Sequence, residues 1–403
     1  FTYTVTAESS FTEESYFKLN GTGVTYTAPG DITESGLTFN YALFDTMHMF
    51  ILDRFNDFYF YQVSTDWNNN YENIKQMIAN SKFKVISFDI FDTLVIRPLY
   101  EPDDIFVLMS KQAAKMIGIS NSSQFCMMRK NAENLARQAA DKGREDITLT
   151  EIYDKFGEIY GVSNTVCKGL YDLEITYEKR YCYRRESGVE LLEMAKAIGK
   201  RVVLTSDMYL ELDVVKNILN GLSITGYDAI YLSSDVGYLK STGNLYRYMY
   251  RHENVDPNKI IHIGDNWQID IERARFVGLE ALFFAKAKEI AFNNIANIPV
   301  GNFMAAFSEN NSSWERTSLA TKDFPIRSLL AMVANKFFDR PNYSFQSKSD
   351  YNGDMYLIGY YCVGFFLLGL SKWLQKRCLE KGINNLKFLA RDGFMPKMAF
   401  DKL

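Results

Sequence analysis

Polar side chains that could carry out chemistry stand at the ends of four short apolar runs. In chain order they are Asp89 after KVISF, Thr205 and Ser206 after RVVL, Lys240 beyond IYLSS, and Asp265 with Asp270 after IIHIG. In an open parallel sheet, ligands bind at the carboxyl ends of the strands, where polar loops and helix N-termini gather. If the four runs are strands of one sheet, these side chains meet at one edge of it.

The residue types in this set suit phosphoryl transfer. The carboxylate of Asp89 can attack an electrophilic phosphorus or carbon and form a covalent intermediate, which divides one difficult displacement into two easier ones. An anion attacking an anion needs neutralising charge. We expect Lys240 to supply a positive charge and Ser206 a hydroxyl donor to the transferring oxygens.

A magnesium site is expected beside Asp89. Mg²⁺ prefers about six oxygen ligands and retains several waters. We predict that Asp89, Asp265 and the backbone carbonyl of Phe91 hold the ion, with waters completing the shell. Asp270 is expected to belong to the metal site, where it orients Lys240 or a metal-bound water, or else to cap the helix that follows it.

Three further polar residues each have two interpretations. Thr205 is either a second donor to the substrate phosphate or a helix cap, like Ser206 beside it. Arg97 is either a bidentate clamp for a substrate anion or part of a hinge salt bridge. His262 lies within an apolar strand, where a hydrogen-bonded core histidine is favoured over a proton shuttle.

The composition is that of a packed globular protein with more than one folding unit. The chain has 403 residues, of which 47% are hydrophobic and 23% charged, and only 8 are Pro. This length exceeds a typical domain of roughly 100 to 200 residues. The formal net charge of -4 provides no basic field for a phosphate backbone, so we expect no nucleic-acid partner.

Cysteine and histidine usage excludes several classes of site and favours the cytoplasm. The five cysteines are scattered without a CxxC pair, and the three histidines form no zinc motif or serine-protease triad. The start at Phe1, with no basic region or cleavage site, suggests an excised segment. The apolar run from Met355 to Leu370 is shorter than the roughly 20 residues of a bilayer span, so we expect a buried helix and no transmembrane segment.

The pattern of apolar residues divides the chain into four parts. A buried strand begins near Lys82, residues 98–185 have helical periodicity, and strands then alternate with helices as in a doubly wound α/β sheet. We predict an α/β core from 81–97 and 186–290 with a helical insert at 98–185. Residues 291–403 are expected to be helical and to begin a truncated second α/β unit, and the acidic, aromatic segment 1–80 has no assigned role.

Four segments resemble the ordered motifs of the haloacid dehalogenase (HAD) superfamily: SFDIFDTL, VVLTSDMY, LKSTGNLY and HIGDNWQID. The resemblance covers residues 82–290. It implies a Rossmann-like core, an aspartate nucleophile at Asp89, a Mg²⁺ cofactor, and a C1-type cap formed by the helical insert.

A narrower resemblance concerns FCMMRKNAENLARQAADKG, LTEIY, SDMYL, GNLY and FLARDGF. These stretches are similar to a bacterial group described as predicted HAD hydrolases, often fused to or encoded beside glycosyltransferases of surface-polysaccharide synthesis. The resemblance implies a phosphorylated sugar or related small molecule as substrate and a glycosyltransferase domain or partner. It also favours Ser206 over Thr205 as the hydroxyl that donates a hydrogen bond to the substrate phosphate.

One position departs from the pattern of HAD phosphatases. They carry a second aspartate two residues after the nucleophile, as general acid and base, and here that position is Phe91. Losing such a group typically costs about 10² to 10⁴ in rate. The adjacent Asp92, where the family usually has Gly, either replaces it or caps the turn. The hypotheses are therefore a phosphatase, a non-hydrolytic binding or scaffold module, and cleavage of a carbon–halogen or carbon–phosphorus bond.

Overall fold

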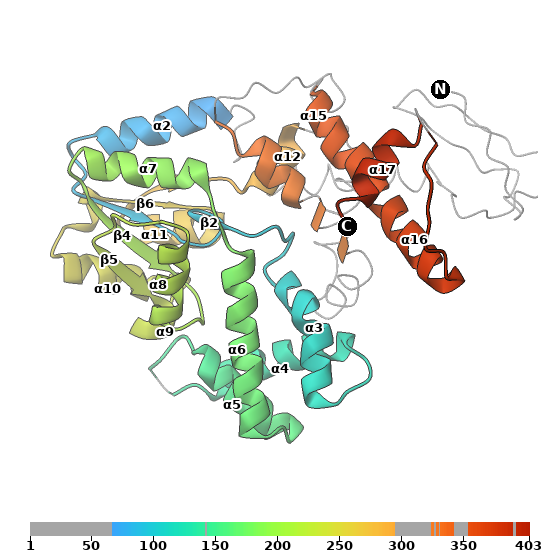
Figure 1. The fold of residues 1–403 in the computed structure, drawn as a ribbon. Helices are drawn as coiled ribbons and strands as arrows, with labels where there is room; N and C mark the ends of the chain where they lie inside the picture. Colours follow the sequence, from blue (N-terminus) through green and yellow to red (C-terminus); the bar gives the residue numbers. More distant parts are fainter. Residues whose placement is uncertain are drawn as a thin grey trace, which may run out of the picture. The chain divides into compact units, whose positions relative to one another are not determined.

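The computed structural model describes residues 67–141, 143–294, 331–341, 354–389 and 392–403, with a few positions between 324 and 329. Most of the predicted segment 1–80 lies outside these residues. Its final part forms helix α2 (Trp67–Ala79), which packs against α7 (Glu186–Ala197). Figure 1 shows these two helices running along one side of the sheet.

A five-stranded parallel sheet forms the core, and its order is β5-β4-β1-β6-β7. The buried apolar run predicted to open the core forms the central strand, which is fully buried. The strands are β1 (Val85–Phe88), β4 (Arg201–Ser206), β5 (Ala229–Leu232), β6 (Ile260–Gly264) and β7 (Glu280–Phe283). The α/β fold class with a parallel sheet is therefore confirmed.

The strand order makes the sheet doubly wound. From β1 the chain moves outward to β4 and β5, then crosses back to β6 and continues to β7 on the other side. Because such crossovers are right-handed, the connecting helices of the two halves fall on opposite faces. The switch point lies between β1 and β6, where a crevice at the carboxyl ends is the expected ligand position. The connecting helices are α7, α8 (Leu212–Gly221), α9 (Ser233–Val236), α10 (Asn244–Glu253), η1 (Pro257–Lys259), η2 (Trp267–Arg273) and α11 (Ala274–Phe276).

The helical insert predicted for residues 98–185 is present as a cap of four helices. Each packs against two of the others, around a core that includes Phe125, Ile152 and Phe156. Arg129 is fully buried among them and donates to both oxygens of Glu174 at 2.8 and 2.9 Å. The cap helices are α3 (Asp104–Ile117), α4 (Ser123–Ala139), α5 (Leu149–Tyr160) and α6 (Asn164–Tyr181).

A short two-stranded ribbon joins the cap to the core. Strands β2 (Val95–Ile96) and β3 (Tyr183–Arg184) pair antiparallel where the chain leaves the core and returns to it. Beside them Arg97 forms an ion pair of 2.8 Å with Glu178 of α6, and both side chains are buried. The two segments that join the cap to the core are thus held together by the pairing of β2 with β3 and by the ion pair between Arg97 and Glu178.

A segment after the predicted core packs back onto it through Asp339. This residue follows the π-helix η3 (Ala334–Phe338) and accepts from Arg185 at 2.9 Å and from the Ser187 hydroxyl at 2.8 Å. The Arg185 side chain is fully buried, and that of Asp339 is 5% exposed. Residues 331–339 therefore belong to the core, beyond the boundary predicted at residue 290.

Replacing Asp339 with Ala should lower the free energy of unfolding by about 3 kcal/mol, because it leaves the buried guanidinium of Arg185 without its carboxylate. Urea unfolding followed by circular dichroism measures this change. The control is Asp401→Ala, which removes an exposed partner of Lys397 and should leave the midpoint in place. Equal midpoints for the two variants would contradict the buried ion pair.

The expectations for the C-terminal region are only partly met. Residues 355–381 are continuously helical as α15 (Met355–Ile358), η5 (Gly359–Gly364) and α16 (Phe365–Lys381), preceded by α12 (Ala287–Asn294) and followed by α17 (Phe394–Phe400). The prediction that the apolar run is buried is wrong, since Phe366 is 66% and Leu368 46% exposed. The segment 383–389, expected to open a second sheet, contains no strand, because no neighbouring strand among the described residues pairs with it. Among those same residues, none of the helices has the length and hydropathy needed to cross a bilayer.

Candidate active site

The site lies at the switch point of the sheet, around Asp89. This residue follows β1, and its backbone N–H donates to the carbonyl of Ile263 in β6 at 2.9 Å. Its carboxylate is buried, and its Oδ1 accepts from Ser206 Oγ at 2.8 Å and from Lys240 Nζ at 2.6 Å. Three of the side chains singled out in the sequence therefore meet, although they come from stretches of chain far apart.

Asp270 is the second carboxylate on Lys240. Lys240 Nζ donates to Asp270 Oδ1 at 2.7 Å, and His262 Nε2 lies 3.2 Å from the same oxygen. The other oxygen of Asp270 accepts from the backbone N–H of Asn266 at 2.9 Å, within the turn that opens η2. Asp270 thus contacts Lys240 directly, while the N-cap of η2 is Asn266 and not Asp270.

Gly264 is required for this placement of Asp270. A Cβ built at Gly264 would lie 2.4 Å from both Cγ and Oδ2 of Asp270, far inside van der Waals contact. Any side chain at this position would push the carboxylate away from Lys240. The glycine before Asp265 is therefore a packing requirement of the site.

Asp265 lies close to Asp89 and has a lysine partner of its own. It accepts from Thr93 Oγ1 at 3.2 Å and lies 3.0 Å from Lys286 Nζ. The same ammonium group lies 3.4 Å from Asp92 Oδ2. Asp92 has φ of 59°, in the left-handed region that favours glycine, and in this conformation its carboxylate reaches Lys286.

The pKa values reflect crowding of carboxylates in a buried site. Burial, with help from Asp270 and Asp265, raises the pKa of Asp89 to about 8 against the opposing effect of Lys240. Burial also raises the pKa of Asp265 despite the nearby Lys286. For Asp270 burial acts in the same direction, but Lys240 and His262 outweigh it and hold the pKa below the usual range. At Asp270 the neighbouring positive charges therefore outweigh the effect of burial on the pKa, whereas at Asp89 and Asp265 burial outweighs the lysines.

The residues present fit a divalent cation. Ligand atoms of Asp89, Asp265 and Asp270 all lie within 4.8 Å of one another, and all three residues are buried. Asp89 and Asp270 share the ammonium group of Lys240, and Asp92 and Asp265 share that of Lys286. This crowding of carboxylates and the all-oxygen donor set suit Mg²⁺. The Phe91 carbonyl remains a predicted ligand.

Arg97 lies over the ring of Phe91, the residue two positions after Asp89. The guanidinium carbon lies 4.6 Å from the ring centroid. Because Arg97 is also paired with Glu178 in the hinge, its charge is already compensated within the protein. The ion pair of Arg97 agrees with the hinge interpretation, and its role as a substrate clamp stays a prediction.

Two other predicted residues lie in the core beside the site. Thr205 is fully buried, and its hydroxyl lies 2.9 Å from Ser87 Oγ, so the substrate-binding role predicted for it is not supported. Successive residues of a strand point to opposite faces, and Ser206 is the one that reaches Asp89. His262 is fully buried between Ser87 and Asp270, as predicted, and burial lowers its pKa.

Three residues of the site are not among those predicted from the sequence. Lys286 follows β7, and Thr93 lies four residues after Asp89. Asp207, next to Ser206, accepts from the backbone N–H of Lys240 at 2.8 Å, and burial raises its pKa to about 6. Lys286 stands just beyond an apolar strand, as the predicted residues do, so the same rule applied to ALFFAK would have found it.

Comparison with known proteins gives matches among solved structures. No protein-family model and no curated protein matches the chain. A HAD phosphatase from Thermococcus onnurineus is 16% identical with a TM-score of 0.37, over 49% of this chain and 85% of that one. The defluorinating L-2-haloacid dehalogenase Rha0230 is 18% identical with a TM-score of 0.39, over 51% of this chain and 83% of that one. The chemistry of the site rests on this chain's own residues.

Proposed function

We propose that the chain is a Mg²⁺-dependent HAD-type hydrolase that removes phosphate from a phosphorylated sugar or related small molecule through an aspartyl-phosphate at Asp89. The observation that carries this proposal is the convergence of Ser206 and Lys240 on one oxygen of the buried Asp89 carboxylate, at 2.8 and 2.6 Å, beside Asp265 and Asp270. A nucleophile, a cation, a hydroxyl donor and a set of metal ligands thus occupy one end of the sheet.

The proposed reaction has two steps. Asp89 Oδ2, which neither Ser206 nor Lys240 contacts, attacks phosphorus as the bond to the alcohol oxygen breaks and that oxygen takes the electron pair. Water then attacks the phosphorus of the aspartyl-phosphate, so that Asp89 leaves as a carboxylate and inorganic phosphate is released. Lys240 and Ser206 stabilise the negative charge on the transferring oxygens in both steps. When bound, Mg²⁺ would add Lewis-acid stabilisation of that charge.

The alcohol oxygen needs a proton, and the residues nearest Asp89 in sequence do not supply one readily. Phe91 cannot carry a proton. Burial alone would raise the pKa of Asp92, but Lys286 and further cations outweigh it and lower that pKa, so this carboxylate is held ionised. We therefore assign protonation of the leaving group to water, which favours leaving groups that are stable as anions.

The proposal is tested by incubating the purified protein with Mg²⁺ and a panel of sugar phosphates, alkyl phosphates and aryl phosphates. The expected result is release of inorganic phosphate, fastest from aryl esters. A protein that releases none from any member, and in which Asp89→Asn changes nothing, would overturn the proposal.

The main alternative is a non-hydrolytic module that binds a phosphorylated glycan intermediate or acts as a scaffold for a transferase. The packing of Phe91 beneath Arg97 favours it, since this ring fills the place of a proton carrier. Phosphate release by the unmodified protein would exclude a binding-only role.

Phe91→Asp should raise hydrolysis of alkyl esters about tenfold while changing aryl esters little, because only the alkyl leaving group depends strongly on a proton. The gain stays below the usual range for a general acid because the neighbouring Arg97 favours the ionised form of the new carboxylate. Steady-state rates on one alkyl and one aryl phosphate measure the ratio. Phe91→Asn, of equal size without an acidic proton, is the control, and identical ratios in the two variants would contradict this account.

The biological setting follows from the resemblance described above. We propose a cytoplasmic role in surface-polysaccharide biosynthesis, with a glycosyltransferase domain or partner handling the same sugar. Co-purification of the protein with a transferase that consumes or produces the phosphorylated sugar it hydrolyses would test the pairing.

A further inference from the structure

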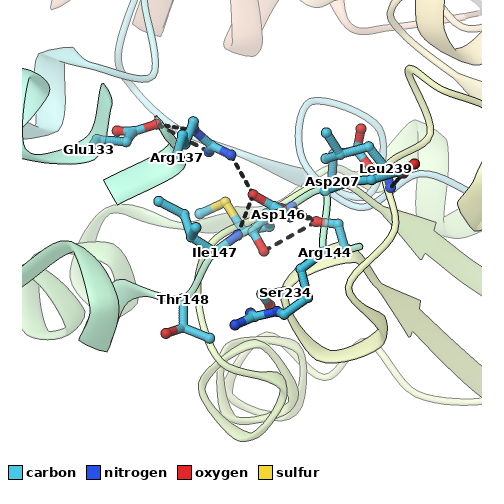
Figure 2. Close-up of polar contacts among 12 residues, drawn as sticks. Glu133, Arg137, Arg144, Asp146, Ile147, Thr148, Asp207, Ser234 and Leu239 are labelled. Carbon is cyan, nitrogen blue, oxygen red and sulfur yellow. Dashed lines mark hydrogen bonds and ion pairs between the residues drawn. The ribbon is translucent and has the colours of Figure 1, made fainter. Parts of the chain in front are cut away.

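Two adjacent acidic residues of the cap bind core residues close to Lys240 and Ser206. They are Glu145 and Asp146, in the loop between α4 and α5. Asp146 is 2% exposed; it accepts from Arg137 within the cap and from the Ser233 hydroxyl of the core. Figure 2 shows Asp146 joined by dashed lines to Arg137 on one side and to the core on the other.

Ser233 connects Asp146 to the loop that follows β4. Its Oγ accepts from the backbone N–H of Met208 at 2.8 Å while it donates to Asp146. Met208 lies two residues beyond Ser206. The carboxylate of Asp146 is therefore linked through the Ser233 hydroxyl to the turn that follows Ser206, the proposed hydrogen-bond donor to the substrate phosphate.

Glu145 acts directly on the turn that carries Lys240. Its Oε2 accepts from the backbone N–H of Leu239 at 2.8 Å and from Thr242 Oγ1 at 2.7 Å. Its own backbone N–H donates to the Gly237 carbonyl at 2.8 Å. The next N–H along the turn, that of Lys240, donates to Asp207 at 2.8 Å. Two successive amides of this turn are thus held by two carboxylates, one from the cap and one from the core.

We propose that Glu145 is a positioning residue that places Lys240 on Asp89 only when the cap is docked. Without the Glu145 carboxylate the amide of Leu239 loses its side-chain acceptor, whereas the amide of Lys240 keeps Asp207. Docking of the cap then also brings the ammonium group of Lys240 to Asp89. The catalytic consequence rests on the proposed function, whereas the placement of the turn does not.

Hydrogen–deuterium exchange of the substrate-free protein tests the placement. Glu145→Ala should speed exchange of the Leu239 and Lys240 amides about ten- to hundredfold, the effect of losing a charged hydrogen-bond acceptor. Glu145→Gln retains an acceptor oxygen and should fall between Glu145→Ala and the unmodified protein. The matched control is Glu158→Ala, an exposed acid of the same cap that pairs only with Lys155 among the described residues.

Unchanged exchange at both amides in Glu145→Ala would overturn the proposal. So would an equal increase throughout the core, because it would mean general loosening, and Glu145→Gln guards against simple misfolding. If the protein hydrolyses phosphate esters, Glu145→Ala should also lower kcat about tenfold with KM changed less than threefold. Absence of hydrolysis in the unmodified protein, with the exchange difference intact, would remove the proposed function and leave the positioning role standing.

Discussion

Asp89→Asn should reduce phosphate release at least about 10⁴-fold, because an amide cannot form the covalent phosphoryl intermediate. The same change should leave the fold intact or slightly stabilise it. Burying this carboxylate beside Asp265 and Asp270 is unfavourable, as its raised pKa indicates, and the substitution removes that charge. Single-turnover phosphate release and thermal unfolding measured on the same sample separate the two effects.

Thr205→Ser is the matched control for this experiment. It lies next to Ser206 on β4 but points to Ser87 in the core, so its hydrolysis rate should stay within about twofold of that of the unmodified protein. If Asp89→Asn retained more than a tenth of the activity while Thr205→Ser lost most of it, the assignment of the nucleophile would be wrong.

Removing divalent ions with a chelator should abolish hydrolysis, and Mg²⁺ should restore it. Mg²⁺ should also raise the thermal midpoint, because it neutralises carboxylates that two lysines compensate incompletely. A ligand at 100 times its Kd stabilises a folded protein by about 2.7 kcal/mol. Thermal unfolding with chelator, with Mg²⁺, and with NaCl of equal ionic strength measures this difference.

Asp265→Ala is the diagnostic variant for the metal site. It should remove both the rescue by Mg²⁺ and the Mg²⁺-dependent rise in midpoint, since Asp265 is one of the three clustered carboxylates proposed to hold the ion. The control is Asp228→Ala, which removes a carboxylate at the opposite end of β4 and should keep the full response to Mg²⁺. A midpoint insensitive to Mg²⁺ in the unmodified protein would argue against resident magnesium.

The sequence predicted those parts of the site that depend on local pattern. Buried strands are continuous apolar runs, and the residue that ends such a run lies at the ligand edge of a parallel sheet. This rule predicts Asp89, Ser206 and Asp265 as residues of the site. The strand order then places Ser206 and Asp265 near the carboxylate of Asp89. The cap was equally predictable, because its helices have regular apolar periodicity.

Other features depend on packing that one sequence does not encode locally. At the end of β4, only one of Thr205 and Ser206 can face the site, and the choice depends on the register of β4 against β1. The contact of Arg97 with Phe91 requires the chain after β2 to fold back on the segment that follows Asp89. Asp339 was unpredictable for a related reason, since its partner Arg185 lies more than a hundred residues earlier and on the other side of the predicted boundary.

Arg185 also determines how the chain can be divided for expression. Its guanidinium donates to the carbonyls of Asp92 and Ala285 and to the carboxylate of Asp339, so one side chain ties together three stretches distant in sequence. A recombinant fragment ending between Lys286 and Asp339 would retain every residue of the proposed site yet leave this guanidinium in the interior with only neutral acceptors. The shortest soluble fragment should therefore start before α2 and end beyond Asp339, and screening of C-terminal end points would show an abrupt gain in yield at that position.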